Sequence, residues 1–158
     1  MPLTVPFRLP RGFRRIREDD IPRTFRTSDK RMNRVTLRDY YDYSRQKNQY
    51  VVLLVEADEL LGIMAFMVCG DHIYLEWLAR NAAISTEERV GSKLISLLEG
   101  IARQLEKYEI RLDSLDSSFS WYVRLGYQSC GAPFPEDRWG TLTPMRKRLS
   151  LFGDAQSA

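Results

Sequence analysis

A glutamate in an alternating segment is the side chain of this sequence best suited to acid–base chemistry. Residues 72–79 alternate in character, so a strand there would place Tyr74, Glu76 and Leu78 on one face. A carboxylate held between a tyrosine and a leucine loses part of its hydration, which raises its pKa toward the range of a general base. A glutamate that faces water fits the same pattern, so Glu76 is a candidate base and both interpretations stay open.

The single imidazole and the two thiols exclude several other chemistries. His72 is the only histidine, which rules out a histidine-based metal centre and any mechanism that needs two histidines. As a base it is a weaker candidate than Glu76. Cys69 and Cys130 are too few for a disulfide scaffold or a cysteine-rich zinc site, and neither has the adjacent base that activates a nucleophilic thiol.

Length and composition predict one folded domain in the cytoplasm. The chain has 158 residues, of which 44% are hydrophobic and 28% charged, as in ordinary globular domains. The sequence has no run of 18 apolar residues, and residues 1–15 lack the apolar core of a secretory signal. Neither a membrane span nor secretion is therefore expected, and reduced thiols are the default.

Charge is distributed unevenly along the chain. Residues 1–50 carry 13 basic against 6 acidic side chains, a net charge of +7, whereas the remaining residues carry a net charge of −4. A basic first third attracts an anionic partner. An arginine-rich surface that only faces water fits the same count. The sequence alone therefore does not distinguish an anionic partner from a solvated surface.

Hydrophobic periodicity predicts an alternation of strands and helices around a mixed sheet. Strands are expected at 13–17, 50–55, 60–69, 72–79, 109–113, 127–130 and 140–149. Helices are expected from 18–22, from Thr36 to about Lys47, from the capping-box pattern Ser85–Glu88 to about Gln104, and from Asp116 or Ser117 to Gly126, with loops at 27–34 and 131–139. Because 60–69 is apolar on both faces, helices should cover both sides of the sheet.

This order of elements resembles the GNAT superfamily of acyl-CoA-dependent N-acetyltransferases. The resemblance runs from about Phe13 to Leu149 and rests on three local patterns. The family's long helix opens near G-I-G-x-x-L-L, and residues 90–95 read V-G-S-K-L-I. Its fourth helix reads roughly A-x-x-F-Y-x-x-x-G-F, and residues 118–127 read S-F-S-W-Y-V-R-L-G-Y. The family often ends on M-x-K-x-L, and residues 145–149 read M-R-K-R-L.

The resemblance implies an α/β (α+β) fold with a mixed, mostly antiparallel sheet and helices on both faces. It implies a flexible arm at 1–12, one acetyltransferase domain at 13–149 and a tail at 150–158. The implied activity is transfer of an acetyl group from acetyl-CoA, a co-substrate, to a primary amine. That amine is left open between a small molecule, a protein and an aminoacyl-tRNA; a membrane partner is not expected, and a homodimer is left open.

The resemblance also assigns roles to residues at matching positions. Tyr122 falls where the family commonly has the acid that protonates the leaving thiolate, and Glu76 where some members have a general base. Acetyl-CoA binding is implied for three sets of residues. The strand backbone at Leu78, Ala79 and Arg80 would pair with the pantetheine arm. The helix start at Arg89, Val90, Gly91 and Ser92 would hold the pyrophosphate. The third set is Ser117, which lies before the next helix.

The phosphate-binding loop departs from the family's pattern, Q/R-x-x-G-x-G/A. Residues 86–91 read T-E-E-R-V-G, so only the last glycine is present. In one interpretation the backbone amides at 90–92 still bind the pyrophosphate, and Arg89 or Lys93 supplies positive charge. In the other, Ser85 and Glu88 cap a longer helix, and the chain is a non-catalytic binding module that holds a protein or RNA through its basic first third.

Overall fold

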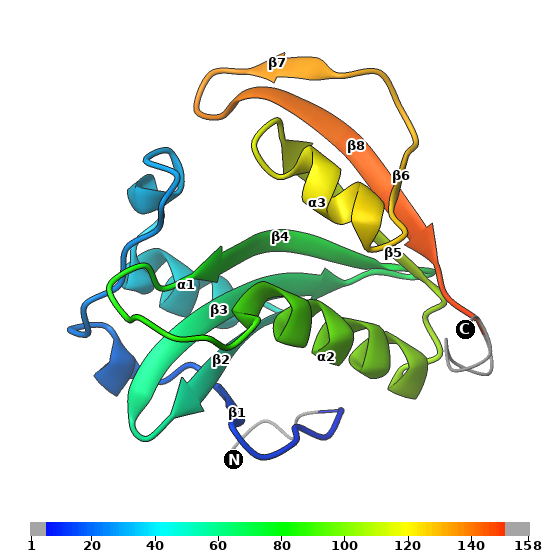
Figure 1. Cartoon of the computed structure of the whole chain (residues 1–158). Coiled ribbons are helices and arrows are strands. Elements are labelled where there is room, and N and C mark those ends of the chain that lie inside the picture. Colours follow the sequence, from blue (N-terminus) through cyan, green and yellow to red (C-terminus); the bar gives the residue numbers. More distant parts are fainter. Residues whose placement is uncertain (1–5, 151–158) are drawn as a thin grey trace.

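Three antiparallel strands form the centre of the structure, a computed structural model that describes residues 6–150 (Figure 1). They are β2 (Gln49–Glu56), β3 (Glu59–Val68) and β4 (Ile73–Arg80), which match the predicted meander. The remaining strands flank it: β1 (Phe13–Arg15), β5 (Glu109–Leu115), β6 (Gln128–Ser129), β7 (Phe134–Glu136) and β8 (Gly140–Arg148).

The sheet is mixed, and its strands run in the order β1-β2-β3-β4-β5-β8-β6, with β7 paired to β8 outside this path. Every described pairing is antiparallel except that of β4 with β5. The parallel pair follows from α2 (Val90–Gln104), which crosses from the end of β4 to the start of β5. The predicted mixed, mostly antiparallel sheet is therefore confirmed.

Helices cover opposite faces of the sheet, as the apolar pattern of its middle strand predicts (Figure 1). α2 packs Leu94 and Leu98 on one face, where α3 (Phe119–Arg124) joins the same apolar cluster. α1 (Leu37–Ser44) packs on the other face, and the ring of Tyr40 lies 5.2 Å from that of Trp77. Two short 3₁₀ turns, η1 (Glu18–Asp20) and η2 (Met32–Arg34), precede α1.

Two helix ends follow the predicted capping signals. Thr36 and Asp39 cap the start of α1 reciprocally, since each side chain accepts a hydrogen bond from the other residue's backbone N–H. Gly126 follows the end of α3 with a φ of +94°, and its N–H donates to the carbonyl of Val123 while that of Tyr127 donates to Tyr122. This pair of bonds is the glycine-dependent helix stop that the sequence indicates.

The predicted start of the long helix is wrong by four residues. α2 begins at Val90, with Arg89 as its N-cap, and not at the capping-box pattern of Ser85 and Glu88. Residues 85–89 stay irregular because other groups hold them. The Arg80 guanidinium donates to the Thr86 carbonyl at 3.2 Å, and the N–H of Glu88 donates to the Thr86 hydroxyl at 3.1 Å.

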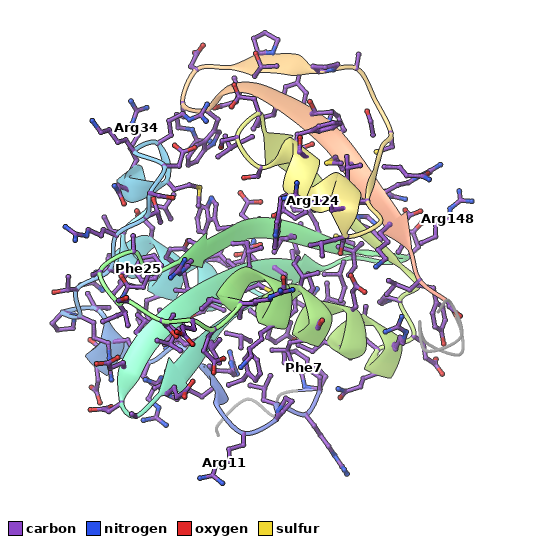
Figure 2. The ribbon with its side chains drawn as sticks, in the orientation of Figure 1. Phe7, Arg11, Phe25, Arg34, Arg124 and Arg148 are labelled. Carbon is purple, nitrogen blue, oxygen red and sulfur yellow. The ribbon has the colours of Figure 1, made fainter. Side chains whose placement is uncertain are left out.

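Part of the segment expected to be an arm is packed against the domain. Phe7 is 6% exposed, and its ring lies 5.2 Å from that of Tyr50 and 5.8 Å from that of Phe66 (Figure 2). Phe7 and Leu9 of this segment therefore contribute to the core that α2 covers. Residues 1–5 of the predicted arm and 151–158 of the predicted tail lie outside the described residues.

The loop expected at 131–139 contains a short strand. β7 pairs with the start of β8 over three residues and forms a hairpin with it. Its middle residue, Pro135, lacks a backbone N–H and weakens any prediction of a strand from the sequence. This hairpin places residues 136–140 near the open end of the sheet, where the candidate site lies (Figure 1).

Gly62 sets the distance between α2 and the sheet, which gives a direct test of the fold. A Cβ at Gly62 would lie 2.3 Å from Cγ1 of Val90 and 3.2 Å from the carbonyl oxygen of Ala79. We expect Gly62→Ala to lower the free energy of unfolding by about 1–3 kcal/mol, as overpacked cores do, in urea titrations. Gly100→Ala is the control, because nothing lies within 4 Å of a Cβ there. It should be neutral or gain up to about 1 kcal/mol from helix propensity. Equal stability of Gly62→Ala and wild type would contradict the close packing.

Candidate active site

Strands β4 and β5 part after a short parallel ladder, and the opening between them forms the candidate site. They pair only from Ile73 with Ile110 to Leu75 with Leu112. Beyond that point β4 stays paired with β3, and β5 with β8. The edge of β4 that faces the opening, residues 77–80, therefore has no strand partner on that side within residues 6–150.

A bulge in β4 places one extra residue at the point of divergence. The register between β3 and β4 shifts there, so Ala65 faces Trp77 and Phe66 faces Leu75. Glu76 is the residue left between these pairs. Bulges redirect a side chain relative to the regular pleat, and this one lies where the two strands begin to separate.

A cavity of about 370 Å³ occupies the opening, and several residues with predicted roles line it. Glu76 and Tyr122, the candidate base and acid, both line it, together with the strand residues Leu78, Ala79 and Arg80. The other lining residues come from the segment before α1, from β4, from β5 and the start of α3, and from the β7–β8 hairpin. They are Thr27, Ser28, Asp29, Met32, Tyr74, Trp77, Asp113, Ser114, Leu115, Ser118, Phe134, Glu136, Arg138, Trp139 and Leu142.

The pKa of Glu76 is raised above its ordinary value. The main cause is loss of hydration within the concave site, although water still reaches the side chain. The nearby carboxylate of Asp113 raises the pKa further, and the guanidinium of Arg138 partly offsets this. Glu76 is thus an exposed glutamate with a raised pKa, and its role as a base stays a prediction.

Asp113 is a cavity residue that the sequence analysis did not identify. Its carboxylate accepts a 2.7 Å hydrogen bond from the hydroxyl of Tyr74, one strand away. This bond, together with burial, raises the pKa of Tyr74 well above its usual range. The only available signal was that Asp113 lies near the end of a predicted strand, and the pairing with Tyr74 spans 39 residues.

Tyr122 is buried in an aromatic cluster and keeps its proton. Its ring lies 4.9 Å from that of Trp121 and 5.6 Å from that of Tyr127. Burial raises the pKa of its phenol well above the ordinary value. The hydroxyl of Tyr122 is therefore protonated at any physiological pH.

The start of α2 carries free backbone amides and balanced charge. Within residues 6–150 no side chain caps this helix start, and no acidic residue lies in its first turn. The ammonium of Lys93 contacts the carboxylate of Glu88, which neutralises one of the two acidic groups before the helix. An uncapped helix start of this kind attracts an anion.

The residues predicted to hold the pyrophosphate do not line the same cavity as Glu76. Arg89 and Ser92 line a larger groove of about 1180 Å³, which runs between α2, residues 10–13 and residues 54–57. Val90 is buried. Gly91 lies under the indole of Trp121, since a Cβ there would be 3.0 Å from the ring. Gly91 is thus also a close-packing position between α2 and α3.

Ser117 is directed to another segment and is not among the residues that line the cavity. Its hydroxyl donates to Oδ2 of Asp29 at 2.9 Å, and its N–H donates to Asp116. Its neighbour Ser118 lines the cavity instead.

His72 lies at the start of β4, where Nδ1 is 2.7 Å from the carboxylate of Asp71. It is not among the residues that line the cavity, so the alternative base is remote from the candidate acid. Among residues 6–150 no three potential metal ligands cluster. No helix in that range combines the length and apolar character needed to cross a bilayer.

A second hollow adjoins the cavity on the α1 side of the sheet. Its volume is about 410 Å³, and three residues line both spaces: Trp77, Arg138 and Trp139. Tyr43, from α1, lines the second hollow, and its ring lies 5.3 Å from that of Trp77.

Comparison with known proteins places this fold. No protein-family model matches the chain, and no curated protein matches it either. Among solved structures, Ard1 from Thermoplasma volcanium is 16% identical with a TM-score of 0.69, and the match covers 87% of this chain and 97% of that chain. A GCN5-related N-acetyltransferase from Rhodopseudomonas palustris is 17% identical, with a TM-score of 0.65 and coverage of 87% and 94%.

A third match is an aminoglycoside 6'-N-acetyltransferase solved with coenzyme A. It is 17% identical, with a TM-score of 0.58, and the match covers 71% of this chain and 79% of that chain. These likenesses show that the chain has the fold of the GCN5-related N-acetyltransferases, as its order of elements predicts.

Proposed function

We propose that this protein transfers an acetyl group from acetyl-CoA to a primary amine. One observation carries the proposal: a single cavity, at the parting of β4 and β5, holds a carboxylate with a raised pKa, a protonated phenol and an unpaired strand edge. Acetyl transfer to an amine needs a base, a leaving-group acid and a rigid support for the thioester.

In the proposed reaction Glu76 first accepts a proton from the arriving ammonium, directly or through one water molecule, and passes it to solvent. The neutral amine nitrogen then attacks the thioester carbonyl carbon and loses a second proton to Glu76. The carbon–sulfur bond then breaks, and the hydroxyl of Tyr122 gives its proton to the departing sulfur. Solvent takes the proton from Glu76 and restores the one on Tyr122, so the net products are the amide and coenzyme A.

The unpaired edge of β4 is the proposed support for acetyl-CoA. Backbone groups of Leu78, Ala79 and Arg80 are free to pair with an extended chain that carries its own amides, as a further strand would. The pantetheine arm of acetyl-CoA is such a chain. In this arrangement the helix start at Arg89–Ser92 binds the pyrophosphate through its amides, with positive charge from Arg89.

Charge at the cavity favours a cationic acceptor over an anionic one. Among the lining residues, four carboxylates (Asp29, Glu76, Asp113 and Glu136) face two guanidinium groups (Arg80 and Arg138). Arg31 pairs with one of these carboxylates, Asp29, and Arg138 pairs with Glu136, which leaves Glu76 and Asp113 beside Arg80. Two other arginines of the basic first third are engaged elsewhere, since Arg14 pairs with Asp20 and Arg23 with Asp20 and Asp58. We therefore propose a protonated amine as the group that arrives at Glu76.

The binding-module alternative depended on a helix that extends to Ser85 and closes the phosphate site. The structure does not contain that extension. α2 begins at Val90, with its first amides uncapped. No feature of the described residues favours that alternative over acetyl transfer.

Acetyl-CoA binding is the first test of this proposal. Acetyl-CoA at 100 times its dissociation constant should stabilise the protein by about 2.7 kcal/mol in thermal unfolding. Arg89→Glu reverses a charge at the proposed pyrophosphate site and should weaken the affinity about tenfold or more. Arg45→Glu makes the same change in net charge beside α1, on the opposite face, and should leave the affinity unchanged. Equal affinities of both variants would contradict the pyrophosphate placement, and absence of any stabilisation in wild type would contradict the function.

A further inference from the structure

One arginine joins three chain segments that are distant in sequence. Nε and Nη2 of Arg31 donate to the carboxylate of Asp29 at 3.1 and 2.9 Å. Nη2 also donates to Oδ1 of Asp116 at 3.0 Å, and Nη1 donates to the carbonyl of Trp139 at 2.8 Å. The hydroxyl of Ser117 adds its bond to Asp29. We call these five residues the Arg31 clamp.

The segments that the Arg31 clamp joins are walls of the candidate cavity. One wall comes from residues 27–32, one from the end of β5 and the start of α3, and one from the β7–β8 hairpin. Arg31 itself is not among the lining residues, so it acts from behind the walls. Because the guanidinium spans from Asp29 to Trp139, it closes the space between the first wall and the hairpin.

Two of the walls, residues 27–32 and the β7–β8 hairpin, are also held by bonds of their own. The side chain of Asn33 accepts from the N–H of Thr27 at 2.7 Å, and the carboxylate of Glu136 accepts from the N–H groups of Arg138 and Trp139. Arg34 adds a second link, since its Nη1 donates to the carbonyl of Arg138 at 3.3 Å. Figure 2 shows Arg34 beside the end of the β7–β8 hairpin.

We propose that Arg31 is a positioning residue that sets the size of the acceptor, so that the cavity admits a small cationic amine and excludes the amine of a peptide or a folded protein. This inference rests on the proposed acetyl transfer and narrows its acceptor. A peptide would need an open passage between the walls to bring its amine to Glu76. The Arg31 clamp spans that passage on one side, and the remaining cavity of about 370 Å³ must also hold the acetyl end of the donor.

The chemistry of the clamp requires an arginine. A planar guanidinium with five N–H groups reaches three acceptors at once, whereas an ammonium on a flexible chain does not. The arrangement is strongly ionic, because the Arg31 guanidinium holds the pKa of Asp29 at about 2. The clamp therefore stays intact at every pH at which the protein would work.

The test compares two acceptor sizes with the wild type and Arg31→Lys. The small probes are cadaverine, tyramine and spermidine, and the large probe is a ten-residue peptide with a free N-terminus and one lysine. Release of coenzyme A is measured. In wild type, kcat/KM for the most active small amine should exceed that for the peptide by about 100-fold, a ratio typical of discrimination by shape. In Arg31→Lys, KM for that amine should rise about tenfold as the Arg31 clamp loses ionic hydrogen bonds and the walls shift, and the preference for the amine over the peptide should fall about tenfold, with kcat for the amine and acetyl-CoA affinity nearly unchanged.

Arg23→Lys is the matched control. Arg23 also bridges two carboxylates, those of Asp20 and Asp58, and its side chain is 28% exposed against 30% for Arg31, but it lies away from the cavity. This variant should leave KM unchanged. Amide hydrogen exchange supplies a second measurement without any acceptor: Arg31→Lys should speed exchange in residues 136–140, and Arg23→Lys should not.

The outcomes separate this inference from the function on which it rests. If acetyl-CoA is bound but the wild type uses the peptide as well as the small amines, or uses none of the small amines, the inference fails while acetyl-CoA binding stands. An unchanged KM and unchanged exchange in Arg31→Lys also overturn it. If acetyl-CoA is not bound at all, the proposed function fails, and the inference fails with it.

Discussion

Tyr122→Phe should lower kcat about 100-fold or more while leaving the affinity for acetyl-CoA close to that of wild type. The substitution removes only the hydroxyl proposed to protonate the leaving sulfur. No hydrogen-bond partner of that hydroxyl is found within residues 6–150, so the phenylalanine should fit the aromatic cluster with little change in stability. Turnover is measured as coenzyme A release with the small amines named above, and affinity by calorimetry.

Tyr127→Phe is the control for this prediction. Tyr127 is a buried tyrosine of the same cluster, but its hydroxyl donates to Glu99 at 3.2 Å and it does not line the cavity. We expect its loss to reduce stability and to leave kcat nearly unchanged. If Tyr122→Phe turns over as fast as wild type, Tyr122 is a core residue and the acid lies elsewhere.

Glu76→Gln should lower kcat/KM about 100-fold and change its dependence on pH. A base works in its deprotonated form, so wild-type activity should rise as the pH rises through the pKa of Glu76. Because that pKa is raised, the rise should lie above pH 4.5, the ordinary value for a glutamate. The variant should lack this rise, and a pH profile of kcat/KM for each protein gives the comparison.

Glu76→Gln should also reveal how much the ionised carboxylate of Glu76 lowers the free energy of unfolding. A raised pKa means that folding disfavours the ionised form, and this cost is present above the folded-state pKa and absent at low pH. Glu76→Gln should therefore melt slightly higher than wild type at pH 7 and not at pH 3. Glu59→Gln, on the exposed start of β3, should change neither activity nor melting. A variant that keeps the wild-type pH profile would exclude Glu76 as the base.

The sequence predicts this fold well where local patterns determine the structure. The meander from Tyr50 to Ala79 follows from β-branched runs separated by polar turns, and the end of α3 follows from Gly126. These features depend on neighbours a few residues apart, which is the range over which periodicity carries information. The alternation predicted over residues 72–79 is broken by the bulge at Glu76: Leu75 packs in the cluster beneath α2, whereas Trp77 packs in the cluster beneath α1.

The sequence does not predict features that depend on distant contacts. A local S-x-x-E pattern indicated a helix start at Ser85, but Arg80 holds the Thr86 carbonyl and keeps the segment irregular. Arg31 was counted only as part of a basic surface, yet its partners lie 85 and 108 residues away. No periodicity reports such bonds, so the walls of the cavity become visible only in three dimensions.

The short ladder between β4 and β5 has a consequence for the lifetime of the chain in a cell. Within residues 6–150, the backbone ladder between the two wings of the sheet has three residue pairs. A ligand that pairs with the free edge of β4 would lengthen that seam and make the wings open less often. Proteases cleave chains that open transiently, at a rate set by how often the open form occurs. With a ligand bound as proposed, the abundance of this protein would therefore depend on the supply of that ligand.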